Sequence, residues 1–480
     1  MQAVLSGWSC LGRVGTALAL FVQMSTVVWA QALPAELAAA WKNTRLPESS
    51  LSLVVQEVDG RRLIEVNPQV PRNPASVMKL VSTWAGLSAL GPEYTWRTNF
   101  MAVGGLHVDE QGTLKGPLYI KAGGDPLLSV PELWDALRQL RLRGVKNISE
   151  IVVDRSVFGS VTINPHAFDS AGDRPYNASP DAMMVGLGAS RLVFQPDTQA
   201  KKWIAMIDPP LPGVRLQGEV QWVDAVCPGS PAVGTEIQAA GNEINIQLSG
   251  KAVGSCGEFS VYRLVHSQTD FFSKLVLALW RDLGGTLARG ITEGKVPASA
   301  QNIVSHESRS LSDLIRVINK QSNNVMARTI LLTVGKELQG EGATVRTGEQ
   351  AVMSVLAQQG VDTRGWVVDN GSGLSRNGRI TAGGMAQMLS VAWHSTLMPE
   401  FVSSLAISGV DGTVRRRLRD DEVQGRAHLK TGTLRDSRAL AGYVLGASGK
   451  RYILVSIVND DRSAAVRPFD DAVVKWLATQ

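Results

Sequence analysis

The sequence predicts an α+β protein: a five-stranded antiparallel sheet with helices on its faces, interrupted by an insertion of two smaller domains. Three observations predict it. A β-hairpin pattern near the N-terminus is followed directly by an apolar helical stretch, and regular strand and helix patterns close the chain. Between these two parts lie about two hundred residues with a different pattern of predicted strands and helices. A chain of 480 residues is also too long for one ordinary domain, which agrees with an insertion.

The N-terminus has the pattern of a secretory signal peptide. Residues 1–30 carry a single charge, Arg13, ahead of an apolar run, and Ala30 and Ala32 are alternative cleavage points. A membrane anchor is the alternative, which the short apolar run disfavours. Cleavage would leave two cysteines, Cys227 and Cys256, and an even number in an exported chain favours a disulfide between them.

The first structural elements follow from local patterns. Residues 34–41 form a short amphipathic helix pattern, and residues 51–58 and 61–66 alternate as strands around an Asp-Gly turn, which is typical of a hairpin. A helix is predicted next, beginning at Pro74 and ending before residues 91–92, Gly-Pro.

The start of that helix carries a serine and a lysine three residues apart, in Pro74-Ala75-Ser76-Val77-Met78-Lys79-Leu80. Residues at this spacing lie on one face of a helix, so Lys79 can act as a base for the hydroxyl of Ser76. The unpaired N–H groups of a first helical turn also favour a developing alkoxide. The motif alone is weak evidence, because it recurs by chance in long chains.

The middle of the chain contains two different patterns of predicted secondary structure. Strands at about 118–121 and 150–154 alternate with helices at about 131–143 and 271–283, which indicates an α/β domain. Between 194 and 262 the apolar runs are short and bounded by Pro or Gly, which indicates a small all-β unit that holds both cysteines. We therefore predict a main domain of residues 33–96 and 299–480, an inserted α/β domain of 97–195 and 262–298, and an inserted β domain of 196–261.

Two further motifs lie in the C-terminal part. Ser322-Asn323-Asn324 falls between helix patterns at 311–318 and 325–334, and Lys430-Thr431-Gly432-Thr433 lies on a predicted strand. Strands at 439–445 and 452–458 and a helix at 464–478 follow. S-x-x-K, S-x-N and K-T-G in this order, each on a suitable element, are the signature set of serine penicillin-recognising acyl-transferases.

With these motifs the chain resembles the low-molecular-mass class C penicillin-binding proteins, which are D-alanyl-D-alanine carboxypeptidases and endopeptidases. The resemblance extends to LYIKAGGDP at Asp125, VVDRSVF at Asp154 and DNGSGLSR ending at Arg376. It implies a serine β-lactamase/DD-peptidase-like fold. More than two hundred residues separate Lys79 from Ser322, where the family inserts two small domains and a β-lactamase does not.

The resemblance also implies roles for the motif residues. Ser76 would attack the carbonyl of the penultimate D-alanine, and Lys79 would be its base if burial and the nearby Lys430 keep its amine partly neutral. Ser322 would relay the proton to the leaving amine, and Asn324 would bind the substrate amide. The remaining implied roles are carboxylate binding by Lys430 and Thr431, close approach of the substrate at Gly432, and an oxyanion hole from the backbone N–H groups of Ser76 and Thr433.

Similar enzymes hold the diaminopimelate side chain of the stem peptide with an aspartate from the insert and an arginine after the G-S-G-L-S turn. Arg376 matches the arginine. Asp169 and Asp173 both match the aspartate imperfectly, and we select Asp173 with Asp169 as the alternative.

The expected partners are peptidoglycan stem peptides ending in D-Ala-D-Ala, D-Ala-diaminopimelate cross-links, and β-lactam antibiotics as inhibitors, met in the periplasm. Nucleic acid is not expected, because the net charge of +5 is spread along the chain and the arginine run at 415–417 adjoins acidic residues. No metal or organic cofactor is expected. A catalytically weak peptidoglycan-binding scaffold or sensor, or a β-lactamase, are the alternatives. The sequence leaves open whether carboxypeptidase or endopeptidase cleavage is preferred. It also leaves open the oligomeric state, for which a homodimer is one option.

Overall fold

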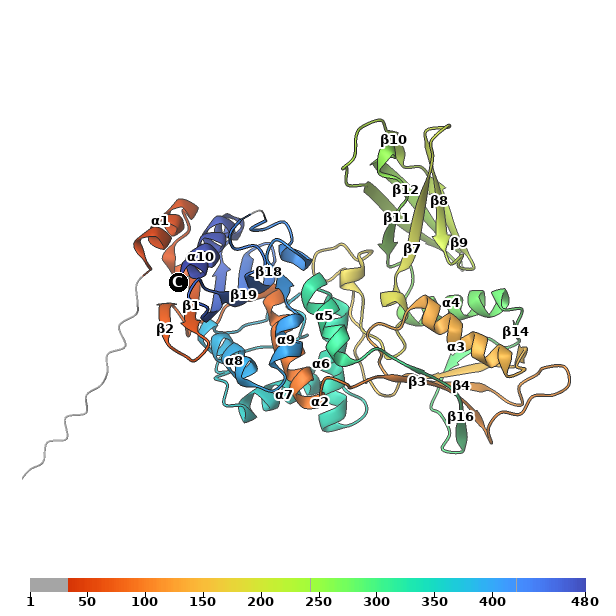
Figure 1. Ribbon diagram of the computed structural model, residues 1–480. Coiled ribbons are helices and arrows are strands. Elements are labelled where there is room, and N and C mark those ends of the chain that lie inside the picture. The colour runs from red at the N-terminus through yellow and green to blue at the C-terminus, as the bar shows by residue number, and fades with distance from the viewer. Residues whose placement is uncertain (1–32, 242, 420) are drawn as a thin grey trace, which may run out of the picture.

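The computed structural model describes residues 33–241, 243–419 and 421–480, so the predicted signal peptide lies outside the described residues. Within them, no helix combines the length and the apolar character needed to cross a membrane. The chain forms a main body at the left of Figure 1 and an insert at the right, whose small β unit stands above its α/β unit.

The main body is built on one antiparallel sheet with the strand order β17-β18-β19-β20-β1-β2. The predicted five strands are present, and a two-residue strand, β17, adds a sixth at the edge beside β18. The α+β fold class is confirmed. The strands are β1 (Leu51–Glu57), β2 (Arg62–Val66), β17 (Ala406–Ile407), β18 (Ala427–Thr433), β19 (Ser437–Leu445) and β20 (Arg451–Asn459).

Helices cover both faces of this sheet, so its central strands are apolar on both sides. On β1, Leu53 and Val55 pack with the terminal helices, whereas Val54 between them packs with the central helices. The terminal helices are α1 (Ala35–Thr44) and α10 (Arg467–Thr479). The central helices are α2 (Met78–Leu90), α5 (Leu311–Gln321), α6 (Asn324–Gln339), α7 (Val345–Gln358), α8 (Ala382–His394) and α9 (Met398–Ser403).

The α/β unit of the insert is a mixed five-stranded sheet in the order β15-β6-β4-β3-β16, with helices α3 (Val130–Leu142) and α4 (Gln268–Asp282) over one face (Figure 1). Its last strand, β16, pairs with β3, so we place the end of the insert after Glu307 instead of at residue 298. The strands are β3 (Arg97–Val103), β4 (Leu118–Lys121), β6 (Ile151–Asp154), β15 (Ile291–Glu293) and β16 (Ala300–Glu307), and a separate pair is β5 (Asn147–Ile148) with β14 (Thr286–Leu287).

The small β unit packs two sheets around a separate apolar core. Phe194 stacks on Phe259 at 4.9 Å between ring centroids, which places β7 in this unit, so we set its limits at about 190 and 263. The predicted disulfide between Cys227 and Cys256 is confirmed. The strands are β7 (Ser190–Asp197), β8 (Lys202–Asp208), β9 (Val214–Gly218), β10 (Gln221–Val223), β11 (Ala232–Ala240), β12 (Glu243–Val253) and β13 (Phe259–Arg263).

A buried carboxyl group under the main sheet has a measurable consequence. Asp470 on α10 is 4% exposed and accepts a hydrogen bond from Ser456 Oγ at 2.8 Å, and burial raises its pKa from 3.8 to about 6. The folded protein therefore binds this proton more tightly than the unfolded chain. The protonated carboxyl of Asp470 contributes its whole stabilisation below about pH 4. This contribution is lost as the pH rises through about 6.

We expect Asp470→Asn to raise the melting temperature at pH 7, because the neutral amide avoids a cost of up to about 3 kcal/mol for the buried carboxylate. The gain should shrink as the pH approaches 4. Differential scanning calorimetry of both proteins across this range measures it, and an equal difference at pH 4 and pH 7 would contradict the assignment.

Candidate active site

The nucleophile candidate lies in a 3₁₀ turn that leads directly into α2. This turn, η2 (Ala75–Val77), contains Ser76, and α2 continues from Met78. Ala75 has a φ of +46°, in the left-handed region that costs a non-glycine residue about 1 kcal/mol. Its N–H donates to Asn73 Oδ1 at 2.9 Å, which holds the turn in this conformation.

Lys79, one turn later, has its ammonium group within reach of three oxygens. Its Nζ lies 3.1 Å from Ser76 Oγ, 2.6 Å from Asn324 Oδ1 and 2.6 Å from the carbonyl oxygen of Ser372. The two carbonyl oxygens can only accept, whereas the hydroxyl can donate or accept. A neutral amine would therefore donate to both carbonyls and direct its lone pair at the proton of Ser76. This is the geometry of a general base.

The surroundings favour that neutral form. Lys79 is completely buried, and its pKa is lowered well below the ordinary value by burial and by the positive charges of Lys430 and Arg328. Burial lowers the pKa of Lys430 to about 7. Arg328 was not predicted from the sequence. It follows Asn324 by one turn of α6, but helical spacing alone does not indicate which distant lysine it approaches.

The second motif lies at the junction of two helices. Ser322 caps α5 with a left-handed φ of +59°, and Asn323 begins α6 by accepting a hydrogen bond from the N–H of Met326. Lys430 Nζ donates to Ser322 Oγ at 3.0 Å. Asn324 uses its oxygen for Lys79 and donates from Nδ2 to the carbonyl of Tyr176 at 3.3 Å, which leaves one N–H for a substrate.

The third motif lies on β18, directly against the nucleophile turn. A Cβ on Gly432 would come within 2.4 Å of the carbonyl oxygen of Pro74, so only glycine allows this approach. Gly432 is therefore needed for the packing of β18 on η2, and the close approach of a substrate at this residue stays a prediction. Thr431 Oγ1 donates to Thr413 Oγ1 at 2.8 Å, on the adjacent turn η6 (Gly412–Val414).

These motifs share a groove of about 800 Å³. The predicted residues Ser76, Ser322, Asn324, Thr431 and Thr433 line it together with Arg376, while Lys79 and Lys430 lie buried beneath its surface. Residues that the sequence did not indicate also line it: Phe168, Tyr176, Gln321, Leu374, Thr413, Leu434 and Arg435.

Arg376 lies over an aromatic ring of the insert. Its guanidinium is 4.4 Å from the ring centroid of Phe168, and an Nη atom lies 3.5 Å from a carboxylate oxygen of Asp436. The arginine is half exposed. An exposed cation held by a stack and a loose ion pair can accept a carboxylate from a ligand.

The selection of Asp173 for this groove is wrong, and Asp169 is the aspartate that lines it. The carboxylate of Asp173 is 3.0 Å from the buried Arg263 Nε and accepts a hydrogen bond from Thr235 Oγ1 at 2.9 Å. It lines a different cavity, between the loop of residues 162–181 and the β unit. The sequence could not separate the two aspartates, because their difference lies in which distant side chains they meet.

Asp169 is held in its charged form. Its Oδ2 accepts from the hydroxyl of Tyr176 at 2.8 Å, and its Oδ1 accepts from Asn177 Nδ2 at 2.8 Å. Burial alone would raise its pKa, but these hydrogen bonds outweigh that effect and lower it. The carboxylate is exposed at the groove and suits a cationic group of a ligand.

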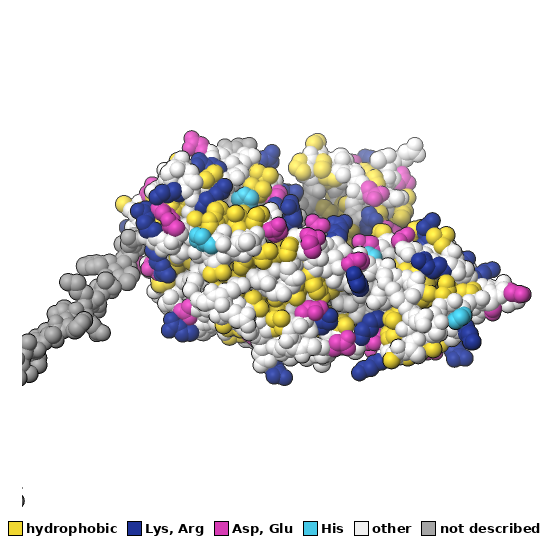
Figure 2. Space-filling view, turned by 60° about the horizontal axis from the view of Figure 1, so that its bottom comes forward, with side chains coloured by type: hydrophobic (Ala, Val, Ile, Leu, Met, Phe, Trp, Pro, Cys, Tyr) yellow, Lys and Arg dark blue, Asp and Glu magenta, His cyan; other side chains and the backbone are white. Residues whose placement is uncertain are grey.

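Among the residues that the structure describes, no group of three or more His, Cys, Asp or Glu side chains is placed to hold a metal ion. On the face shown in Figure 2, positive and negative side chains are interspersed without a single large field of one sign.

Comparisons with known proteins show a family for this chain. The family model described as D-Ala-D-Ala carboxypeptidase 3 (S13) matches residues 33–480. The chain is 26% identical over 442 residues to a D-alanyl-D-alanine carboxypeptidase of Actinomadura sp. (strain R39), covering 89% of this chain and 80% of that protein.

Two solved structures share the fold. Penicillin binding protein 4 (dacB) from Haemophilus influenzae has a TM-score of 0.74 at 21% identity, covering 93% of this chain and 100% of that chain. The predatory endopeptidase Bd0816 from Bdellovibrio bacteriovorus, solved with an immunity protein, has a TM-score of 0.50 at 14% identity, covering 89% and 92%.

The charge of Arg328 should influence the pH at which labelled penicillin acylates the protein at half its maximal rate. If Lys79 acts as a neutral base, acylation is lost as the pH falls through its pKa. Arg328→Gln removes one of the charges that lower this pKa, so we expect the half-maximal pH to rise by on the order of 0.5 to 1 unit. Second-order acylation rates between pH 5 and 9 measure it.

Lys336→Gln is the matched control, because it removes a cation from the same helix beside Glu337 and outside the groove. Its profile should coincide with that of the unmodified protein. An Arg328→Gln profile that is unmoved, or moved to lower pH, would exclude the proposed influence on Lys79.

Proposed function

The chain belongs to the D-Ala-D-Ala carboxypeptidase 3 (S13) family, and we propose that it cleaves D-alanyl-D-alanine bonds of peptidoglycan stem peptides through an acyl-enzyme on Ser76. One observation carries the assignment of the nucleophile. The buried amine of Lys79 lies 3.1 Å from Ser76 Oγ, and its other two contacts are carbonyl oxygens that can only accept.

Acylation begins with attack of Ser76 Oγ on the carbonyl carbon of the penultimate D-alanine, while the hydroxyl proton passes to Lys79 Nζ. The negative charge that develops on the carbonyl oxygen is stabilised by the backbone N–H groups of Ser76 and Thr433. In acyl-transfer enzymes one such donor contributes about 3 kcal/mol. The left-handed Ala75 and the approach of Gly432 to Pro74 support this role, because they place the two segments side by side.

Collapse of the tetrahedral intermediate breaks the C–N bond, and the departing amine takes a proton through the hydroxyl of Ser322. Lys430 donates to that hydroxyl and, with Thr431, binds the terminal carboxylate. An anionic terminus beside Lys430 favours its ammonium form, although burial lowers its pKa to about 7 in the free protein. Water then hydrolyses the ester. A β-lactam offers the same amide, and its acyl-enzyme reacts slowly with water.

The groove also offers a place for the stem residue before the D-alanine. A diaminopimelate side chain ends in one ammonium and one carboxylate. Arg376 over Phe168 suits the carboxylate, and Asp169, held by Tyr176 and Asn177, suits the ammonium. Both residues line the same groove as Ser76.

We propose endopeptidase cleavage by the same site. A D-Ala-diaminopimelate cross-link presents the same acyl group to Ser76 as a free terminus does, and the two differ only in the leaving amine. The groove lined by Thr413 and Arg435 lies open at the surface beside the carboxylate-binding Thr431. The predicted signal peptide in residues 1–30 supports a periplasmic location, where peptidoglycan is the available substrate.

The nucleophile can be tested directly. Labelled penicillin should modify the protein once, on the peptide that contains Ser76, and Ser76→Ala should abolish the label with an unchanged melting temperature. Intact-mass and peptide mass spectrometry measure the label and its site, and thermal unfolding measures the melting temperature. Digestion of purified muropeptides followed by mass spectrometry shows which bond is cut. Labelling of Ser76→Ala would contradict the proposal, and no labelling of the unmodified protein would favour an inactive scaffold.

The side-chain pocket makes a separate prediction. Arg376→Ala and Asp169→Ala should each lower kcat/KM for diaminopimelate-containing peptides by roughly tenfold or more, because each leaves a charge of the ligand without its partner. Penicillin acylation, which does not use this pocket, should change by less than about threefold.

Asp173→Ala is the matched control from the same loop. It should lower stability, because it leaves the buried Arg263 without its carboxylate, but keep the preference for diaminopimelate peptides. Equal loss of peptide and penicillin reactions in the Arg376 and Asp169 variants would show that these residues are structural.

A further inference from the structure

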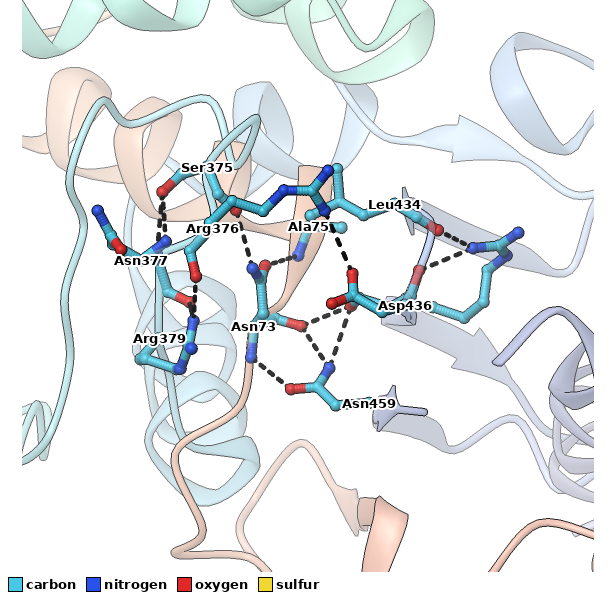
Figure 3. A network of polar contacts seen from close by, with 12 residues as sticks. Asn73, Ala75, Ser375, Arg376, Asn377, Arg379, Leu434, Asp436 and Asn459 are labelled. Atoms are coloured by element: carbon cyan, nitrogen blue, oxygen red, sulfur yellow. Dashed lines mark hydrogen bonds and ion pairs between the residues drawn. The ribbon is translucent and has the colours of Figure 1, made fainter. Parts of the chain in front are cut away.

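Asn73, three residues before Ser76, makes five hydrogen bonds and is 8% exposed. It belongs to none of the three sequence motifs. Figure 3 shows it at the centre of a polar network between the nucleophile turn, the loop that carries Arg376 and the ends of two strands.

The main chain of Asn73 is fastened to the sheet. Its N–H donates to Asn459 Oδ1 at 2.8 Å, at the end of β20. Its carbonyl oxygen accepts from Ser437 Oγ at 2.7 Å, at the start of β19, and from Asn459 Nδ2 at 2.9 Å. Three bonds to two adjacent strands fix the position from which the turn toward Ser76 begins.

The side chain of Asn73 connects two functional segments. Its Oδ1 accepts from the N–H of Ala75, the left-handed residue directly before Ser76, at 2.9 Å. Its Nδ2 donates to the carbonyl of Ser375, directly before Arg376, at 2.9 Å. One planar amide group therefore sets the distance between the backbone of the nucleophile and the backbone of the arginine.

The segment around Ser375 makes hydrogen bonds of its own. Ser375 Oγ accepts from the N–H groups of Asn377 and Gly378 at 2.9 and 3.1 Å. On the opposite side, Asp436, which pairs with Arg376, directly precedes Ser437. Asn73 is thus bonded to Ser375, the neighbour of Arg376, and to Ser437, the neighbour of Asp436.

From this network we infer that Asn73 is a positioning residue that couples side-chain recognition at Arg376 to attack by Ser76. This inference rests on the proposed acyl-transfer function. Its Oδ1 holds Ala75 in the conformation that directs Ser76 into the groove, and its Nδ2 holds the Arg376 loop at a constant distance from that serine. A displacement of about 1 Å in such a site costs about a hundredfold in rate.

The first test is Asn73→Ala with penicillin, analysed as a pre-covalent dissociation constant and a first-order acylation rate constant. We expect the rate constant to fall by tenfold or more, because Ala75 loses its acceptor. The dissociation constant should change by less than about threefold, since Ser322, Lys430 and Thr431 keep their contacts.

Tyr443→Phe is the control for loss of a buried hydrogen bond in the same sheet. Tyr443 lies on β19, is 1% exposed and donates to the carbonyl of Leu389 at 2.8 Å, outside the groove. It should lower the melting temperature and leave both penicillin constants within about twofold. If Asn73→Ala also lowers only the melting temperature, the residue is merely structural and the inference is overturned.

Asn73→Asp separates the two bonds. It keeps an oxygen for the N–H of Ala75 but places a second oxygen opposite the carbonyl of Ser375, where the two repel. We expect its penicillin rate constant to lie closer to that of the unmodified protein than that of Asn73→Ala does. Its preference for a diaminopimelate peptide over the same peptide with a neutral side chain should fall by about fivefold or more.

Unchanged peptide preference in Asn73→Asp would overturn the coupling to Arg376, and this variant decides the question if Asn73→Ala does not fold. Failure of the proposed function is recognised separately, because the unmodified protein would then take up no label on Ser76.

Discussion

The structure of this site depends on the burial of two lysine amines without a carboxylate partner. Lys79 and Lys430 are both fully buried, and in the described part of the chain the hydrogen bonds of their amines go to hydroxyl, amide and main-chain oxygens instead of carboxylates. An isolated ammonium is costly in such a place, so burial lowers the pKa of both amines. For Lys79 this favours the neutral form that a general base needs. The fold supplies neutral oxygens instead, from Asn324, Ser372 and Ser322.

Two residues next to the reacting groups have strained backbone. Ala75 and Ser322 both adopt left-handed conformations, one before the nucleophile and one at the cap of α5. Each costs about 1 kcal/mol or more and persists because the surroundings determine it. The bonds of Asn73 and the close contact of Gly432 with Pro74 provide that constraint at Ser76.

The insert is joined to the catalytic machinery through the same helix that tunes Lys79. The carbonyls of Tyr176 and Ala178 accept hydrogen bonds from Asn324 and Arg328, one turn apart on α6. These two side chains hold Lys79 and lower its pKa, respectively. The loop that brings Asp169 to the groove is therefore bonded to the two side chains that surround Lys79, the residue proposed as the base.

The sequence by itself determined whatever depends on neighbours along the chain. The spacing of Ser76 and Lys79 places both on one face of a helix, alternation identified the hairpin and the C-terminal strands, and the three motifs together indicated the family.

Only the tertiary structure decided what depends on distant packing. Asn324 and Ser372 lie 245 and 293 positions from Lys79, Arg328 and Asn73 belong to no motif, and strand β16 pairs across the insert with β3. The choice between Asp169 and Asp173, four positions apart on one loop, was decided by Tyr176 and Asn177 for the first and by Arg263 for the second. The physical reason is that local spacing sets the directions of nearby side chains, whereas the partner of a charged group is set by which remote surfaces the fold brings against it.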